Sequence, residues 1–384
     1  MQERTIDPTA EQTSVATPHR WLRLLRVAGP AFVVGAWQFG PGNLTSAVQA
    51  GTQFGHALIW VIAVSTVLMI AFTDMSVRIA LRARESLITT TKAVLGRATG
   101  TIAGIGVFCI TLMFSVGNAV GSGLGLSMIF GGNPVLWTLV CTVAVAVVVF
   151  ARNTYRLVER ALLAIVAIMA IGFLASALLT DPSWAEAARG FIPTIPDGVG
   201  LLLVALVGTN FSINAAFYTG YATRQRRMEE KDYADIVAGD TVPGIVAPGI
   251  MTILVMVVAA TAASVTGVES GSLQQLVGVL EPLAGTAGKT IFAIGFFGAA
   301  FSSLTANPGA GGTLISDGLG WGNSLESRRV KTMILTVLAF GLAVTIAFGG
   351  SSPVQLIIVA QALTVIFAPI LGVILFILAN NRRH

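Results

Sequence analysis

Helix-breaking and polar residues interrupt two long apolar stretches of this chain near their middles. In "QFGPGNLTSA", residues 38–47, Gly40, Pro41, Gly42 and Asn43 stand in a row. In "LLLVALVGTNFSINAAFYTGYATRQR", residues 201–226, the polar residues also cluster near the middle, and they are Thr209, Asn210, Ser212 and Asn214. Glycine and proline end or kink a helix, and the backbone groups that they free must find partners inside a membrane. Each break is therefore either a tolerated kink or the edge of a binding site.

The composition places the chain in a membrane. Of 384 residues, 54% are hydrophobic and 11% are charged, whereas soluble domains carry about 25% charged residues. The net charge of +5 does not indicate nucleic-acid binding, because the basic residues are spread between apolar segments. Cys109 and Cys141 both lie in apolar runs, so neither a disulfide framework nor a thiol metal site is expected.

Ten membrane spans are expected, since about twenty apolar residues cross a bilayer. They lie near 28–51, 56–78, 101–130, 134–151, 158–180, 198–221, 237–264, 287–306, 330–349 and 354–380. With this count, nearly all basic loop residues fall on one side of the membrane, and the other side holds only Arg189 and Lys289. Positive charge marks the cytoplasmic side. The sequence thus predicts an all-α protein of the cytoplasmic membrane with both termini in the cytoplasm.

The two breaks predict an internal repeat. Gly40 shifted by about 170 residues falls on Asn210, and each break opens one half of the chain. We expect a cytoplasmic tail over 1–26 and two inverted five-helix repeats over 27–196 and 197–384. Interrupted spans in corresponding positions of two halves are the best sequence indication of a transporter binding site at mid-membrane.

Three segments resemble the Nramp-type divalent-metal transporters (natural resistance-associated macrophage proteins). "GPAFVVGAWQFGPGNLTSAVQAGTQFG" resembles their first span, with its D-P-G-N signature. "IFAIGFFGAAFSSLTANPGAGGTLISDGLGW" is similar to their eighth span and following loop, and "LIIVAQALTVIFAPI" to their tenth. The resemblance covers about residues 26–380 and implies the broken-helix, inverted-repeat fold that these proteins share with amino-acid transporters. The resemblance leaves the family's usual eleventh span without a counterpart in these residues, so ten spans are expected.

The chain departs from the family where the resemblance would place the metal. The family's aspartate corresponds to Gly40, and its sixth-span motif M-P-H-N corresponds to residues 212–215. A second histidine corresponds to Thr219, and the acidic pair of the third span corresponds to Ser115 and Asn118. The residues that match the family are Pro41, Gly42, Asn43 and Gln361.

A neutral polar site is what these residues leave. The candidate substrate-binding residues are Gly40, Asn43, Thr209, Asn210, Ser212, Asn214 and Gln361, and a possible polar pathway comprises Ser115, Asn118 and Thr219. Ser115, Asn118 and Gln361 also have a structural interpretation, as hydrogen-bonding groups between helices. No metal-ligand set and no bound cofactor are expected, because transition metals prefer carboxylate, imidazole or sulfur ligands.

Three kinds of cargo fit such a site. We expect a small anion such as bicarbonate, since hydroxyl and amide groups donate hydrogen bonds and half-helix N-termini attract anions. The alternatives are a divalent cation carried with most of its water, Mg²⁺ or Mn²⁺, and a small polar solute. The coupling ion is not specified by the sequence.

Functions of other classes are less well supported. No nucleophile–base set and no phosphate-binding loop is present, so we expect no enzyme and no ATP-driven pump. A non-transporting sensor would need a large output segment, and the loops are short. A channel would not need paired breaks.

Overall fold

The structure is a computed structural model that describes residues 27, 29–83, 85–150, 167, 170–175, 177–178, 182–266, 281–348 and 352–381. Helices make up its regular structure, and no strand occurs among these residues. The elements are α2 (Pro30–Gln38), α3 (Pro41–Phe54), α4 (Ile59–Arg82), α5 (Leu87–Leu95), α6 (Arg97–Phe130), α7 (Pro134–Phe150), α9 (Trp184–Arg189), α10 (Gly200–Asn210), α11 (Ile213–Gln225), η1 (Glu230–Asp232), α12 (Tyr233–Ile236), η2 (Val237–Thr241), α13 (Val242–Thr266), α15 (Glu281–Gly318), α16 (Arg328–Phe348), α17 (Pro353–Leu363), η3 (Thr364–Ile366) and α18 (Ala368–Ala379).

The first predicted break is present between α2 and α3. Helix α2 ends at Gln38, Gly40 is the extended N-cap of α3, and Pro41 occupies the first helical position. A proline is tolerated there because the N–H that it lacks would have no partner in the first turn. The side chain of Asn43 bridges the break, since its Nδ2 donates to the main-chain oxygen of Gln38 over 2.6 Å.

The second predicted break is present between α10 and α11, at Phe211 and Ser212. The register differs slightly from the predicted one. Gln38 and Asn210, the last residues of α2 and α10, are 172 residues apart, not 170, and Gln38 Nε2 donates to the Asn210 main-chain oxygen over 3.5 Å. The two breaks therefore meet in space.

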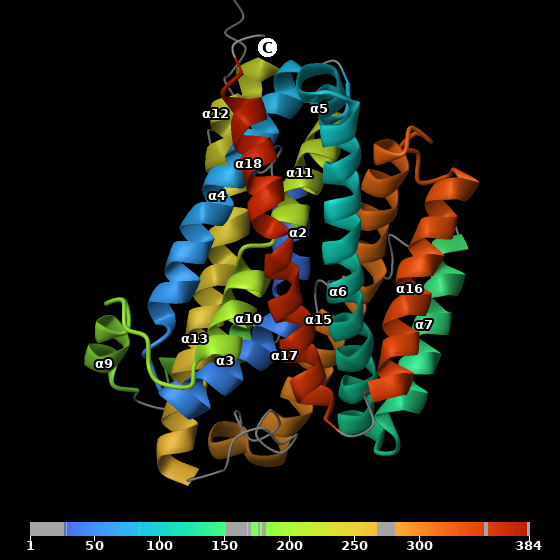
Figure 1. The fold of residues 1–384 in the computed structure, drawn as a ribbon. Helices are drawn as coiled ribbons and strands as arrows, with labels where there is room; N and C mark the ends of the chain where they lie inside the picture. Colours follow the sequence, from blue (N-terminus) through green and yellow to red (C-terminus); the bar gives the residue numbers. More distant parts are fainter. Residues whose placement is uncertain are drawn as a thin grey trace, which may run out of the picture.

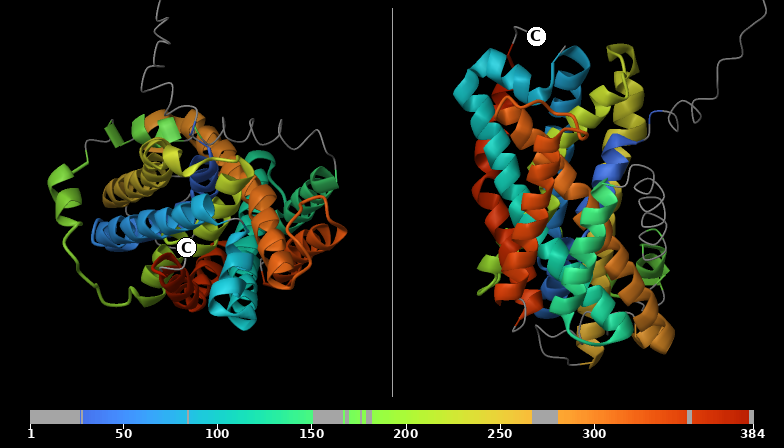
Figure 2. Two further views of the ribbon diagram at one scale, coloured as in Figure 1. Left: turned by 90° about the horizontal axis from the view of Figure 1, so that it is seen from above. Right: turned by 90° about the vertical axis from the view of Figure 1, so that its right-hand side faces the viewer.

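The broken helices lie at the centre of the bundle (Figures 1 and 2). Helix α2 packs on α13, α15 and α11, while α3 packs on α13, α10, α17 and α6. The long helices α6 and α15 pack along each other and form one wall of the central region, with α16 and α7 outside them. Thus four short helices are held between longer ones, and the ends of the short helices face one another.

Basic residues collect at one end of the bundle, which we call the basic end. Helices α4 and α11 end here, and α6 and α16 begin here (Figure 1). Helix α5 lies at the same end. Its basic residues are Arg78, Arg82, Lys92, Arg97, Arg224, Arg226, Arg227, Arg328, Arg329 and Lys331.

Several predicted spans differ in extent from the helices. Seven helices of the described part are long and apolar enough to cross a membrane, a shorter apolar helix covers 134–149, and the predicted fifth span, 158–180, lies mostly outside the described residues. The count of ten is therefore not established. Helix α15 continues to Gly318 through Pro308, well beyond the predicted end at 306. The tenth span is interrupted by the 3₁₀ turn η3 between α17 and α18.

A buried carboxylate holds the start of α2. Asp240, in the π-helical segment η2 before α13, accepts hydrogen bonds from the main-chain N–H groups of Gly29 and Ala31 at 2.7 and 2.9 Å. The first N–H groups of a helix have no partner within the helix, and a negative charge there also interacts favourably with the helix dipole. Asp240 thus fixes α2 to the helix beside it.

Candidate functional site

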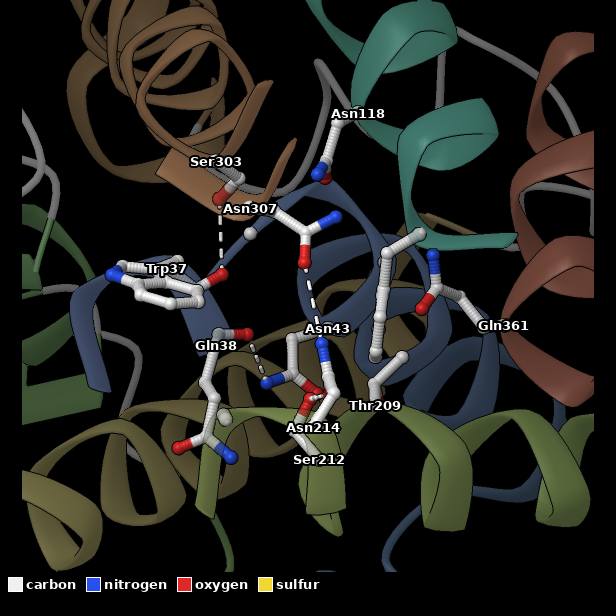
Figure 3. A pocket seen from close by; sticks show the side chains of 14 residues that line it. Trp37, Gln38, Asn43, Asn118, Thr209, Ser212, Asn214, Ser303, Asn307 and Gln361 are labelled. Atoms are coloured by element: carbon white, nitrogen blue, oxygen red, sulfur yellow. Dashed lines mark hydrogen bonds between the residues drawn. The ribbon is translucent and has the colours of Figure 1, made fainter. Parts of the chain in front are cut away.

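A small cavity lies where the four half-helices meet (Figure 3). Its volume is about 20 Å³, which is close to the room needed by one water-sized particle. It is lined by Trp37, Gln38, Gly40, Gly42, Asn43, Phe114, Asn118, Thr209, Ser212, Asn214, Ala215, Ser303, Asn307 and Gln361.

Most of the predicted binding residues are brought together here. Gly40 and Asn43 come from the first break, Thr209, Ser212 and Asn214 from the second, and Gln361 from α17. Asn210 instead lines a smaller adjoining cavity of about 10 Å³, which shares Gln38 and Asn43 with the first.

The predicted polar pathway is only partly present at the cavity. Asn118 of α6 lines it, whereas Ser115 and Thr219 do not. Ser115 Oγ donates to the Leu112 carbonyl and Thr219 Oγ1 to the Ala215 carbonyl, each within its own helix. These two hydroxyl groups are thereby satisfied by the backbone and do not continue a pathway from the cavity.

Sequence reasoning missed several lining residues. Trp37 and Gln38 end α2, Phe114 lies on α6, and Ser303 and Asn307 lie on α15. The residues of α15 carried a usable signal, because "SSLTANPG" is the polar part of an otherwise apolar helix. Because the span was predicted to end at residue 306, this polar segment was assigned to the end of the helix and not to the binding site.

A chain of hydrogen bonds crosses the cavity wall from α6 to α11. Asn307 Nδ2 donates to the Thr111 main-chain oxygen, and Asn307 Oδ1 accepts from Asn214 Nδ2, each over 3.3 Å. Asn214 Oδ1 in turn accepts from Ser212 Oγ over 3.3 Å. Each of these three side chains therefore directs a donor to a protein acceptor (Figure 3).

Two buried oxygen acceptors of the lining have no hydrogen-bond partner. They are Asn43 Oδ1 and Gln361 Oε1. Asn43 turns its nitrogen to the Gln38 carbonyl, so its oxygen is the atom left free. The indole Nε1 of Trp37 also lacks a partner, but it lies on the side of the ring away from the asparagines (Figure 3). Unpartnered buried acceptors favour a ligand that is a cation or a hydrogen-bond donor.

Two glycines position Gln361. A Cβ added at Gly42 of α3 would lie 2.5 Å from Gln361 Cδ, and one added at Gly117 of α6 would lie 2.5 Å from its Nε2. The carboxamide thus occupies a slot between α3 and α6 that exists because both residues are glycine. A buried amide held in this way has little rotamer freedom.

The cavity wall is neutral. No acidic, histidine or cysteine side chain lines it, and the described residues contain no group of three such side chains that could hold a metal. The C-terminal ends of α2 and α10 and the N-terminal ends of α3 and α11 all reach it, so dipoles of both signs are present and do not select the sign of a ligand. The orientation of the side-chain amides, which leaves two oxygens free, favours a ligand that is a cation or a hydrogen-bond donor.

This arrangement is typical of a secondary transporter that binds its substrate between two interrupted membrane helices. The natural resistance-associated macrophage protein-like family matches residues 31–384, and the chain belongs to this family. Members are secondary transporters and not enzymes, so the predictions of family, transporter class and absence of enzymatic activity are confirmed.

Curated relatives support the same family over most of their length. The divalent metal cation transporter MntH of Caldanaerobacter subterraneus subsp. tengcongensis is 23% identical over 372 residues, which are 94% of this chain and 86% of the relative. MntH of Verminephrobacter eiseniae is 26% identical over 333 residues, 84% of this chain and 76% of the relative.

Solved structures confirm the fold. A mutant of the manganese transporter of Eremococcus coleocola has a TM-score of 0.70 at 18% identity and covers 92% of this chain and 78% of its own. MHP1, a nucleobase-cation-symport-1 family transporter in a closed conformation, has a TM-score of 0.57 at 15% identity and covers 92% and 77%. The predicted all-α membrane fold with inverted repeats and broken first and sixth helices is therefore confirmed.

The expected cargo was wrong. The prediction of a small anion such as bicarbonate, with a largely hydrated divalent cation (Mg²⁺, possibly Mn²⁺) or a sensor as alternatives, is contradicted by relatives that are named divalent metal cation transporters. The prediction counted amide and hydroxyl groups as free donors. In the structure Asn43 Nδ2 and Asn214 Nδ2 donate to carbonyl oxygens of the protein, whereas Asn43 Oδ1 and Gln361 Oε1 are buried oxygens without a partner.

Proposed function

We propose that this protein transports a divalent metal cation of the Mn²⁺ type by alternating access, and that the cation binds in the cavity between the two breaks. The observation that carries the proposal is the pair of buried, unpartnered oxygens Asn43 Oδ1 and Gln361 Oε1. Carbonyl oxygen and water are suitable ligands for Mn²⁺, a hard cation, even without sulfur or imidazole. The names of the relatives support the same cargo.

Neutral ligands set the expected strength of binding. Burying an ion costs several kcal/mol unless charge or hydrogen bonds compensate, and the cavity supplies no carboxylate. Additional oxygens can come from the unwound main chain at the breaks, as in other transporters with interrupted helices. We therefore expect weaker binding than in a site with an aspartate, and little competition from protons at the lining residues.

The direction of the molecule in the membrane follows from its charge. The basic end carries the arginines and lysines that flank the spans, and such residues are retained on the cytoplasmic side. We infer that the basic end faces the cytoplasm, together with both termini. The cavity then opens in turn to the basic end and to the opposite end, where α9 lies (Figure 1).

Uptake into proteoliposomes tests the proposal. Wild-type protein should carry Mn²⁺ into vesicles that contain a metal-quenched fluorophore, and Asn43→Ala should reduce the initial rate at least tenfold. Ser115→Ala is the matched control, because Ser115 is buried and polar but bonds within its own helix away from the cavity. Its rate should equal that of the wild type. Equal rates for Asn43→Ala and Ser115→Ala would refute the proposed site.

A further inference from the structure

A second buried carboxylate lies at the basic end, apart from the cavity. Asp317, in the last turn of α15, is 5% exposed. Its oxygens accept hydrogen bonds from the hydroxyl groups of Ser86 and Tyr221, from Thr89 Oγ1 over 3.1 Å and from Asn323 Nδ2 over 3.5 Å. Hydrogen bonds to a carboxylate are about twice as strong as those between neutral groups.

The donors to Asp317 come from separate elements. Ser86 is the N-cap of α5 and Thr89 lies in its first turn, while Tyr221 lies on α11, the basic-end half of the second broken helix. Helix α5 is attached a second time, because Lys92 Nζ donates to the main-chain oxygen of Asp317 over 2.5 Å. The carboxylate of Asp317 thus ties α11 and α5 to α15.

An apolar plug separates this cluster from the cavity. Ile213 and Phe217 of α11, Leu314 of α15 and Ile110 of α6 belong to one packed cluster, and each is at most 1% exposed. The plug shares its helices with the hydrogen-bond groups on both sides. Any solute that moves from the cavity to the basic end between α11 and α15 must pass through it.

Helix α11 is attached to α15 on both sides of the plug. Asn214 bonds to Asn307 at the cavity, and Tyr221 bonds to Asp317 at the basic end. Asn214 and Tyr221 are seven residues apart, which is about two helical turns, so both lie on one face of α11. Release of the Tyr221 bond leaves α11 hydrogen-bonded to α15 only at Asn214, beside the cavity, while α11 still packs on α4. The basic-end half of α11 can then move away from α15.

We propose that Asp317 is a positioning residue that closes the cavity toward the basic end, by holding Tyr221 and with it the plug. The hydrogen bond between Tyr221 and Asp317 breaks when the path opens, and α11 moves away from α5 and α15. This inference rests on the proposed function in one respect, that a transporter must open its cavity to each side in turn.

Thiol labelling measures the opening without any metal. Thr223 lies half a turn beyond Tyr221 on α11 and is fully buried. In a Cys109→Ala/Cys141→Ala background, Thr223→Cys should react slowly with a hydrophilic maleimide in lipid nanodiscs. Adding Tyr221→Phe, which removes only the hydroxyl group, should raise the labelling rate at least tenfold, and Asp317→Asn should do the same.

Two controls separate release of α11 from general loosening. Tyr233→Phe removes another tyrosine–aspartate bond at the basic end, to Asp74 over 2.6 Å, and should leave the rate unchanged. A reporter on the peripheral helix α16, Thr345→Cys, is 2% exposed and should stay unreactive in every variant. An unchanged rate in Tyr221→Phe, or an equal rise at Thr345→Cys, overturns the proposal. The labelling experiment contains no cargo, so a failed uptake assay would not change its result. A failed labelling experiment would likewise leave the proposed cargo and its binding site untouched.

Discussion

Asn43 donates from Nδ2 to the main-chain oxygen of Gln38 over 2.6 Å, across the break between α2 and α3. This bond performs two tasks. It satisfies a carbonyl that the interrupted helix leaves without a partner, and it directs the amide oxygen of Asn43 toward the cavity, where no protein donor meets it. Because the lining contains no ionised group, such orientations determine which polar atoms the cavity offers to a ligand.

Displacing Gln361 should weaken transport although the residue itself is unchanged. Gly117→Ala places a methyl group where it would lie 2.5 Å from Gln361 Nε2, so the carboxamide must leave its slot. We expect the KM for Mn²⁺ uptake to rise about tenfold, equivalent to about 1.4 kcal/mol of binding. Gly200→Ala, at the start of α10 where a Cβ meets open space, is the control and should leave the KM unchanged.

A carboxylate added to the neutral wall should tighten binding of the cation. Asn307→Asp introduces one beside Asn214, and an opposite charge at about 4 Å contributes about 4 kcal/mol at an effective dielectric constant near 20. Desolvation of the new charge offsets much of this, so we expect the Kd for Mn²⁺ to fall about tenfold at pH 7. The gain should shrink as the pH falls and the new carboxyl group is protonated. Titration calorimetry at pH 7 and pH 5 measures both effects.

The control for that substitution carries the same change of charge elsewhere. Asn133→Asp lies in an exposed turn between α6 and α7, where its side-chain oxygen can still accept from Val135 N. It should leave the Kd unchanged. An equal tightening in both variants would mean that net charge, and not the cavity, determines the affinity.

Removing the charge of Asp240 should destabilise the protein. The carboxylate accepts from Gly29 N and Ala31 N, and Asp240→Asn leaves one neutral oxygen to serve both. Hydrogen bonds to charged groups contribute about 1.5–3 kcal/mol each, so the thermal unfolding midpoint should drop by several degrees. Asp197→Asn, in an exposed loop, should leave the midpoint unchanged.

His56 should make the fold sensitive to acid. Burial lowers the pKa of His56 below its ordinary value of 6.5, and the carboxylate of Glu186, with its Oε2 3.8 Å from Nδ1, opposes this with a smaller effect. Because the folded-state pKa is below the unfolded one, the unfolded chain binds the proton first. Stability is therefore unaffected above the unfolded-state pKa and is lost as the pH falls below 6.5.

Thermal unfolding at pH 7.5 and pH 5.5 measures this loss. His56→Gln should reduce the difference between the two midpoints. Glu186→Gln removes the group that raises the pKa of His56 and should enlarge it. The same pH dependence in all three proteins would show that His56 does not contribute.

The sequence predicted the fold well because its signals are local. Gly40 and Pro41 together disfavour a continuous helix, and the polar run around Asn210 marks the second break. Helix ends were predicted less well. Pro308 signals an end, yet α15 passes through it, because tertiary packing against α6 supports a long helix.

The site was only partly predictable, since it depends on how helices are rotated against one another. Asn43 and Ser212 lie at breaks and could be identified as candidates, but nothing local indicates that Asn307 faces the cavity while Ser115 does not. The sign of the cargo was mispredicted for the same reason. Whether an amide offers its N–H or its oxygen is decided by partners distant in the chain, such as the Thr111 carbonyl for Asn307.

Direct binding of Mn²⁺ to the purified protein tests the central claim that neutral oxygens form the cation site. Electron paramagnetic resonance of free Mn²⁺ during a titration should reveal one saturable site in the wild type. Combining Asn43→Ala with Gln361→Ala should reduce the affinity at least tenfold, while the protein keeps its unfolding midpoint within a few degrees. Undiminished binding in the double variant would contradict the claim and would place the cation elsewhere in the protein.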